Sequence, residues 1–218
     1  MSAPQTRRRF IARGLAGLAG LGLLGLPRFA SAWTCQATSP NTRGPYWREG
    51  APATTRFACT EGGTPLFVRG RVVDTSTCRA VSGATLDVWH ADHYGKYDID
   101  YPDLDLDTYL MRGTLRTGDD GTYAFRSIVP KPFGTEGFMR PAHVHFAVRA
   151  EGFQPLTTQM YFAEDPYLDS DPIESVRDDL VVTLAEHENG AALGDASLAG
   201  PCFSAVFDIG LRTGVVGS

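Results

Sequence analysis

Arg140-Pro141-Ala142-His143-Val144-His145-Phe146 is the stretch from which both the fold class and the site can be argued. Residues 143–149 are predicted as a β-strand, so His143 and His145, two positions apart, project from the same face. At about 3.3 Å of rise per residue their Cα atoms lie roughly 6–7 Å apart. Two imidazoles at that spacing can bind one metal ion through bonds of about 2.0–2.1 Å. The alternative is a polar stripe on the outer face of an antiparallel strand.

The chain from Pro65 onward reads as short strands separated by turn signals, with few windows of helical periodicity. One brief helix is expected around residues 172–178. Phenylalanines at alternating strand positions are expected in the core: Phe125, Phe146, Phe162, Phe203 and Phe207. The predicted strands cover residues 66–73, 84–90, 113–117, 122–126, 143–149, 157–162, 180–184 and 204–209, with 113–117 and 122–126 joined as a hairpin by Gly118-Asp119-Asp120-Gly121. Strands at this density predict an all-β sandwich or barrel.

Residues 1–32 read as an export signal. Thr6-Arg7-Arg8-Arg9-Phe10-Ile11 precedes an apolar run at 14–26 and then Ala30-Ser31-Ala32, the pattern of a basic segment, a short hydrophobic segment and an A-x-A cleavage site. The paired arginines resemble a twin-arginine signal; an ordinary secretory leader and an uncleaved anchor are the alternatives. We therefore expect a periplasmic or secreted protein, without stable membrane insertion after cleavage. It would comprise an arm at 33–64 and one domain at 65–218.

The composition limits the partners and the redox compartment that can be expected. After residue 32 the chain keeps 15 basic and 25 acidic residues, a net charge of −10, which argues against nucleic acid and anionic membranes as partners. Two disulfides are the default in an oxidising compartment. Their pairing is open among four cysteines without a C-x-x-C spacing: Cys35, Cys59, Cys78 and Cys202.

Two segments have no regular pattern. Residues 98–108 carry five aspartates and read as a solvated loop; a calcium loop is the alternative, but the glycine and terminal glutamate of an EF-hand are missing. The arm is rich in Gly, Pro and Thr, so packing or its two cysteines must hold it in place.

Further segments extend the pattern around the two histidines. They run in the order Gly44-Pro45-Tyr46, Val88-Trp89-His90-Ala91-Asp92, Gly95-Lys96-Tyr97, Gly113 to Pro130, Arg140 to Phe146, Thr157 to Phe162, and Asp165 to Leu168. Together they resemble the core of intradiol ring-cleavage dioxygenases, such as catechol and protocatechuate dioxygenases. The resemblance implies a β-sandwich of the immunoglobulin or transthyretin kind, and a ferric ion held by two tyrosines and two histidines.

Position by position, the resemblance implies that Tyr97, His143 and His145 bind the metal. Arg140 matches the arginine that lies beside the bound catechol, and Gln159 matches a glutamine behind the ligands. The implied substrates are a small phenolic or catechol-type aromatic and O2. Phenolate and imidazole ligands favour Fe(III), and the bound catecholate then becomes the species that reacts with oxygen.

One position departs from the family's pattern. The second tyrosine should follow Pro130-Lys131-Pro132, but Phe133 stands there, and its ring cannot bind a metal. Three protein ligands and an open position would remain. The preference for ferric iron is weakened, because an N,N,O site suits Cu(II) equally well, with zinc third. Other nearby side chains could substitute, although none occupies a matching position: His90, His93, Tyr46, Tyr94 and Tyr101.

Three functions stay open on the sequence alone. The first is an exported metal-dependent oxidoreductase that acts on catechol-type aromatics, as in the intradiol family. The second is a copper-dependent oxidoreductase or ether-bond-cleaving enzyme for lignin-like phenolics. The third is a non-catalytic metal-binding sandwich, against which Arg140 and Gln159 speak because a metal store needs neither. Catechol dioxygenases dimerise through a long helical N-terminal segment; we expect no such segment here, and a homodimer through the arm is left open.

Overall fold

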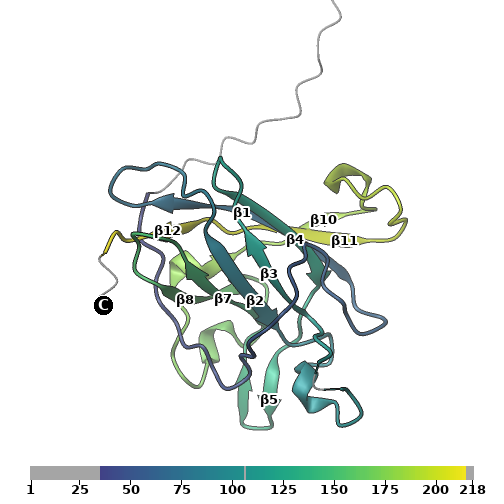
Figure 1. Cartoon of the computed structure of the whole chain (residues 1–218). Coiled ribbons are helices and arrows are strands. Elements are labelled where there is room, and N and C mark those ends of the chain that lie inside the picture. The colour runs from purple at the N-terminus through teal and green to yellow at the C-terminus, as the bar shows by residue number, and fades with distance from the viewer. Residues whose placement is uncertain (1–34, 106, 215–218) are drawn as a thin grey trace, which may run out of the picture. The chain divides into compact units, whose positions relative to one another are not determined.

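The computed structural model describes residues 35–105 and 107–214 (Figure 1). The predicted export signal lies outside these residues. The strands are β1 Pro65–Asp74, β2 Thr85–His90, β3 Arg112–Arg116, β4 Thr122–Ile128, β5 Phe133–Thr135, β6 Phe138–Arg140, β7 His143–Arg149, β8 Leu156–Phe162, β9 Val181–Val182, β10 Ala185–His187, β11 Cys202–Val206 and β12 Ile209–Leu211. The helices of this part of the chain are single 3-10 turns, η1 Asp98–Asp100, η2 Leu168–Ser170, η3 Asp178–Leu180 and η4 Ala191–Leu193. The all-β prediction is confirmed.

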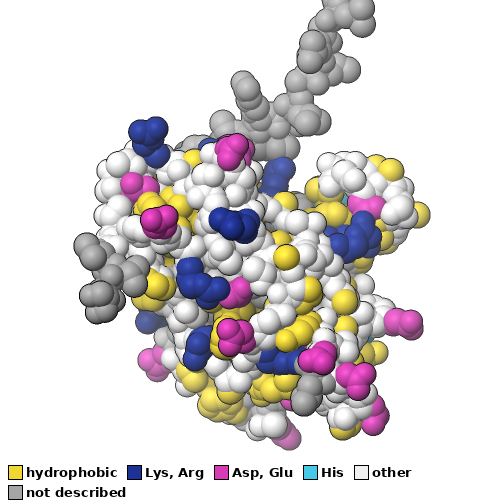
Figure 2. All heavy atoms as spheres, viewed as in Figure 1, with side chains coloured by type: hydrophobic (Ala, Val, Ile, Leu, Met, Phe, Trp, Pro, Cys, Tyr) yellow, Lys and Arg dark blue, Asp and Glu magenta, His cyan; other side chains and the backbone are white. Residues whose placement is uncertain are grey.

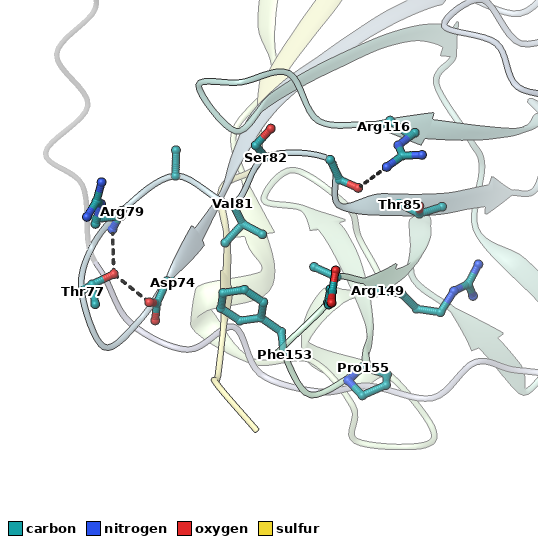
Figure 3. Close-up of a pocket in the computed structure, with 14 residues that line it drawn as sticks. Asp74, Thr77, Arg79, Val81, Ser82, Thr85, Arg116, Arg149, Phe153 and Pro155 are labelled. Atoms are coloured by element: carbon teal, nitrogen blue, oxygen red, sulfur yellow. Dashed lines mark hydrogen bonds between the residues drawn. The ribbon is translucent and has the colours of Figure 1, made fainter. Parts of the chain in front are cut away.

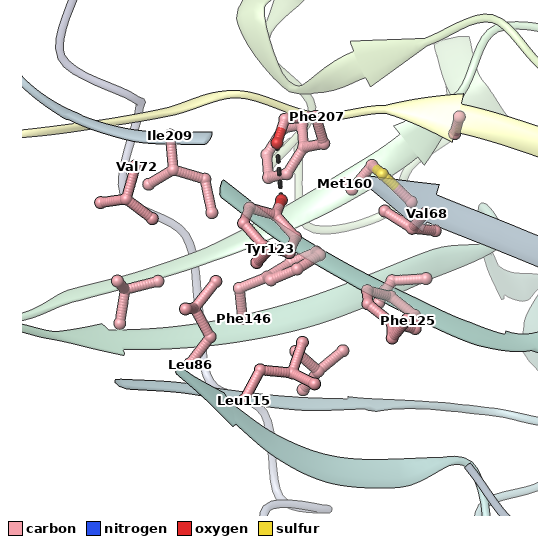
Figure 4. Packing of buried hydrophobic residues seen from close by; sticks show 14 of the residues in the cluster. Val68, Val72, Leu86, Leu115, Tyr123, Phe125, Phe146, Met160, Phe207 and Ile209 are labelled. Atoms are coloured by element: carbon pink, nitrogen blue, oxygen red, sulfur yellow. Dashed lines mark hydrogen bonds between the residues drawn. The ribbon is translucent and has the colours of Figure 1, made fainter. Parts of the chain in front are cut away.

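The strands form two layers (Figure 1). The first sheet has the order β3-β2-β7-β8-β9; the second has β10-β11-β1-β12, with β4 on the other edge of β1. Between them lies one apolar core, in which Leu86, Phe146 and Met160 of the first sheet meet residues of the second (Figure 4). The phenylalanines predicted for the core lie there, fully or partly buried. In the described residues no helix is long and apolar enough to cross a bilayer.

Three local predictions are wrong. The predicted hairpin of residues 113–126 does not form, because β3 pairs with β2 whereas β4 pairs with β1. The turn at 118–121 thus carries the chain from one sheet to the other. A turn signal between two amphipathic strands cannot distinguish these cases, since both strands bury one face in the same core. The predicted helix at 172–178 is also absent: Ser175 bonds the Asp171 carboxylate through its backbone N–H at 3.0 Å and its hydroxyl at 2.6 Å, and such local bonds compete with a helix.

The third wrong prediction is a single strand at 204–209, because the structure divides this segment between β11 and β12. Residues 66–69 of β1 pair in parallel with β11, and residues 72–74 pair in parallel with β12. Between them Phe207 crosses close to Gly70, where an added Cβ would lie 1.9 Å from the Phe207 carbonyl oxygen. The Tyr123 hydroxyl donates to that same oxygen at 2.6 Å (Figure 4). Only glycine permits this approach.

The arm is held at several points before it reaches the outer face of the first sheet. A disulfide joins Cys35 to Cys78 in the turn after β1. The Asn41 N–H donates to the Thr157 carbonyl at 2.8 Å, so the arm runs beside the edge of β8. The expected second disulfide does not form, and Cys59 and Cys202 are free. The Cys59 sulfur lies 3.5 Å from Ser127 Oγ on the inner face of β4, whereas Cys202 and the core residue Ala205 alternate to opposite faces of β11.

Candidate metal centre

Tyr97, His143 and His145 come together on the outer face of the first sheet. Both histidines point away from the core from β7, and Tyr97 reaches them from the loop after β2, where it precedes η1. The two Nε2 atoms are 3.1 Å apart, and the Tyr97 hydroxyl lies 3.4 Å from His143 Nε2 and 3.2 Å from His145 Nε2. At most 3% of any of these side chains is exposed. The structure therefore brings together the three side chains that the sequence pattern predicted as metal ligands.

These distances fit a shared metal ion. At metal–donor bonds of about 2.1 Å, as for zinc, donors separated by 3.1–3.4 Å subtend about 95–110° at the ion, within the range for four- to six-coordinate sites. In the described residues no group of three or more His, Cys, Asp and Glu side chains could hold a metal. The third donor beside the two imidazoles is the phenol of Tyr97.

The protonation states also suit a metal. His143 Nδ1 lies 2.7 Å from the Pro141 carbonyl oxygen, so Nδ1 carries the proton and Nε2 presents its lone pair. Burial, with Arg140 adding to it, lowers the pKa of His143 to about 3; burial and the neighbouring His143 lower the pKa of His145 as well. Burial raises the pKa of the Tyr97 phenol, with Arg140 opposing, so a phenolate here needs a cation beside it.

The imidazole of His145 packs against the ring of Trp89 and the backbone of Gly44. Trp89, its cross-strand neighbour on β2, stacks on it with centroids 4.7 Å apart and planes 3° apart. On another side lies Gly44 of the arm, where an added Cβ would be 3.5 Å from His145 Cε1. Its Nδ1 is buried without a hydrogen bond of standard geometry, although the nearby backbone of Thr42 partly opposes the fall in the pKa of this ring. The ring is therefore oriented by packing, and its Nε2 is turned to Tyr97 and His143.

Arg140 and Gln159 meet beside the three donors. Arg140 Nη2 donates to Gln159 Oε1 at 3.0 Å, to the Tyr161 hydroxyl at 2.9 Å and to Ser175 Oγ at 2.9 Å. Its Nε donates to Asp171 Oδ1 at 3.0 Å. Burial alone would raise the pKa of Asp171, but hydrogen bonds from Arg140 and Ser175 hold it below its ordinary value. The guanidinium is thus fixed by a charged partner and three neutral acceptors.

One nitrogen of Arg140 is left for a ligand. Among the described residues no hydrogen bond reaches Nη1, and this atom keeps some contact with solvent. A buried guanidinium with one free N–H group is suited to bind an anionic oxygen.

The loop of five aspartates is solvated as predicted at Asp100, Asp103, Asp105 and Asp107, but not at Asp98. Asp98 is buried and accepts hydrogen bonds from Arg112 Nε at 2.6 Å and Arg112 Nη2 at 2.5 Å. Arg48 of the arm donates to the same carboxylate at 2.8 Å. Because Asp98 follows Tyr97 directly, this ion cluster anchors the loop that carries the phenol.

Phe133 packs against the donors without joining them. Its ring meets Tyr97 edge-on at 5.5 Å and Tyr46 at 5.0 Å. Tyr46, from the arm, stacks on Tyr97 with centroids 4.1 Å apart and planes 4° apart. Among the residues considered as a fourth ligand, Tyr46 is therefore the one whose ring lies against the site.

The remaining alternatives are engaged elsewhere. His90 projects from the inner face of β2 and its Nε2 lies 2.7 Å from Ser127 Oγ. His93 Nδ1 lies 3.3 Å from Thr60 Oγ1. The Tyr101 hydroxyl donates to Asp92, and Tyr94 is 69% exposed. None of these four side chains has a contact with the three donors.

Several residues of the site are not apparent from the sequence pattern. Tyr161 lies two positions from Gln159 on β8, so strand alternation could have placed both on one face. Asp171 and Ser175 come from an irregular loop and carry no local signal. Asp98 has the composition of a surface loop, and only the fold brings Arg112 to it.

Comparison with known proteins gives concordant matches. The family model described as "Dioxygenase" matches residues 42–213. A chlorocatechol 1,2-dioxygenase of Rhodococcus opacus is 39% identical over 168 residues, which cover 67% of this chain and 65% of that relative; the chain thus spans just under two thirds of its length. The crystal structure of 3-chlorocatechol 1,2-dioxygenase from Rhodococcus opacus 1CP is 30% identical with a TM-score of 0.72, covering 81% of this chain and 73% of that one. The dioxygenase domain of a carbohydrate-binding fusion protein from Streptomyces sp. SirexAA-E is 29% identical with a TM-score of 0.64, covering 82% of this chain and all of that one.

Proposed function

Because the chain belongs to the intradiol ring-cleavage dioxygenase family, we propose that it opens the ring of catechol-type aromatics with O2, between the two hydroxylated carbons. The observation that carries the proposal is the meeting of Tyr97, His143 and His145 within 3.4 Å of one another, beside Arg140. The family generally uses ferric iron, and the proposed ligands of this iron are those three residues.

The chain's own residues would prepare the site in separate ways. The neutral imidazoles present Nε2 lone pairs, while Tyr97 supplies the single anionic donor. Ferric iron, when bound, supplies the Lewis acidity that favours the doubly deprotonated diol. Arg140 Nη1 would donate to a substrate oxygen, with the guanidinium held in one orientation by Asp171. The aromatic rings of Tyr46 and Phe133 form an apolar wall that favours a flat ring over water.

Phe133 alters how a diol would bind. Since no phenol stands at this position, substrate oxygens would reach the iron without displacing a second protein tyrosine. Arg140 is then the cationic group of the chain that would pair with the negative charge of the deprotonated diol. The names of the relatives give no support to the copper-dependent alternative.

Export through a twin-arginine route is part of the proposal. It rests on Thr6 to Ile11 and on Ala30-Ser31-Ala32 in the sequence. The disulfide between Cys35 and Cys78 is compatible with an oxidising compartment.

The test is oxygen uptake and product analysis with purified, iron-loaded protein. We expect catechol to yield a ring-opened muconate-type diacid with one O2 consumed per ring. Metal analysis and EPR of protein exported by its own leader should show high-spin Fe(III). Its visible absorption spectrum should show a tyrosinate-to-Fe(III) band. No oxygen uptake with catechol, hydroxyquinol or protocatechuate would refute the activity, and a stoichiometric Cu(II) signal would refute the iron assignment.

A further inference from the structure

The hairpin β5–β6 extends the wall of the site outward. In its register Phe133 lies opposite Arg140, and Thr135 lies opposite Phe138. Directly opposite residues share a face of an antiparallel pair, as do residues two apart along a strand. All four side chains therefore project from one face of the hairpin. That face is turned to the site, because the Phe133 ring packs on Tyr97.

Phe138 is the outermost member of this face. Two residues along a strand advance about 6.6 Å, so Phe138 lies about one aromatic ring further out than Arg140. It is 49% exposed. The register places it beyond Arg140 along the hairpin, on the face that carries the site residues.

Exposed apolar residues gather on the loops around the site. Six large hydrophobic side chains of the described residues are exposed, and only one of them, Val206 on β11, belongs to the second sheet. The others lie on the segments that follow β2 and β8 and on the hairpin: Tyr94, Ile99, Phe138, Tyr167 and Ile173. Single exposed apolar residues are ordinary, but a concentration around a site marks an interaction surface.

These segments are joined to one another. The Lys131 N–H, just before the hairpin, donates to the Asp92 carbonyl at 3.0 Å. Just after the hairpin the Ala142 N–H donates to Asp165 Oδ2 at 2.9 Å. The segments after β2 and β8 thus lie beside the two ends of the hairpin, and five of the exposed apolar side chains belong to these three neighbouring segments.

The exposed charges on these segments are mostly acidic, and Lys96 and Lys131 are the exposed lysines among them. Glu136 occupies the hairpin turn two positions before Phe138 and is exposed, as are Asp100, Asp103 and Asp105 on the loop that carries η1. Acidic side chains gather at the lower right of Figure 2, over that loop, which is teal in Figure 1. An anionic substituent would be repelled here, and so would an anionic membrane.

We propose that the substrate is a catechol carrying an uncharged aryl substituent, whose second ring packs on Phe138 while the diol occupies the site. This rests on the proposed function and names its substrate class. The spacing of about one ring along the hairpin suits two aryl groups joined directly or through one carbon. Aromatic pairs prefer offset or edge-on contacts, which the exposed face of Phe138 allows.

The test compares Phe138→Ser with Val206→Ser. Both replace an exposed apolar residue, at 49% and 44% exposure, so both should fold, but Val206 lies in the other sheet. With iron-loaded protein, kcat/KM is measured for catechol and for 4-benzylcatechol. We expect Phe138→Ser to lower the value for 4-benzylcatechol about three- to tenfold, the range of one aromatic pair, with less than about twofold change for catechol. Val206→Ser should change neither.

Charge is tested with 3,4-dihydroxybenzoate, an anionic catechol. Wild type should prefer 4-benzylcatechol to it, and Glu136→Gln should narrow that preference by raising kcat/KM for the anion about twofold or more. An unchanged preference would overturn the requirement for an uncharged substituent.

Anaerobic equilibrium binding separates this inference from the proposed function. If no ring-opened product forms, the proposed function fails, while the Kd of 4-benzylcatechol relative to catechol still tests the contact with Phe138. The inference is overturned by an equal loss for both catechols, by the same loss in Val206→Ser, or by no loss. It is also overturned if Phe138→Ser converts a wild-type dimer into monomers in light scattering, because the exposed surface then binds a second copy of the chain.

Discussion

The two ends of the outer face of the first sheet differ in burial. At one end the arm, the hairpin and Tyr97 cover the two histidines. At the other, Thr85 lies between Arg116 and Arg149 in the register of β3, β2 and β7, and these residues line an open groove of about 1020 Å³ together with Phe153 (Figure 3). The groove has the volume of a ligand site, yet it lacks a group of convergent buried donors.

The charged groups at the two ends show the same contrast. Arg149, with 53% of its side chain exposed, pairs with Asp87 at 2.8 Å, and Arg116 donates to the Gly83 carbonyl at 3.2 Å (Figure 3). At the covered end the side chains of Arg112 and Asp98 are 2% and 0% exposed. Hollowness alone therefore does not identify a functional site. A functional site is better identified by buried polar atoms that converge on one point, because such atoms need a ligand to satisfy them.

The largest expected effect comes from a metal ligand. His143→Ala should abolish oxygen uptake and lower iron affinity by more than about a hundredfold, beyond the roughly 10–100-fold typical of residues behind the ligands. Arg149→Ala at the open end should retain iron and activity. Iron content after dialysis against a chelator measures this, and equal iron in both variants would contradict the assignment.

Matched carboxylates test the difference in burial. Asp98→Asn should lower the free energy of unfolding by about 3–5 kcal/mol, because Arg112 is left buried without its charge partner. Asp87→Asn, whose partner Arg149 is largely exposed, should lower it by about 0–1 kcal/mol. Urea unfolding of the two variants gives both values, and similar losses would mean that the two ends do not differ as described.

Loss of the carboxylate that positions Arg140 should have a smaller effect. Asp171→Asn keeps an acceptor for Nε but removes the charge, so we expect kcat/KM for catechol to fall about ten- to a hundredfold through misorientation of the guanidinium. The loss should appear mainly in kcat, with iron content and visible spectrum unchanged. Arg116→Gln is the control from the open end. A loss of iron in proportion to activity would instead assign Asp171 a purely structural role.

The smallest effect concerns the missing phenol. Phe133→Tyr should place a hydroxyl beside the metal, shift the visible tyrosinate band and slow iron release to a chelator about threefold, the equivalent of roughly 0.65 kcal/mol. Phe138→Tyr adds the same phenol on the same hairpin face but about 6.6 Å further out, and should leave spectrum and release unchanged. Identical spectra for both variants would show that position 133 does not face the metal.

Two of the differences between the sequence analysis and the structure have a common cause. The turn at 118–121 and the loop of five aspartates were interpreted from local composition, but their structure depends on distant partners. β4 pairs with β1 and not with β3, although all three strands bury a face in the same core, and Asp98 is buried because Arg112 reaches it. Local propensity carries no information about which remote residue will arrive.

The sequence by itself determined the all-β class and the family, and it predicted which three residues meet as proposed metal ligands. Strand alternation places His143 and His145 on one face, and the order of the surrounding segments brings in Tyr97, Arg140 and Gln159. Only the tertiary structure decided that Asp171 fixes Arg140, that Asp98 anchors the loop of Tyr97, and that one end of the sheet is covered while the other is open. The physical reason is that spacing along a strand is a property of the backbone, whereas burial and charge pairing depend on contacts between segments far apart in the chain.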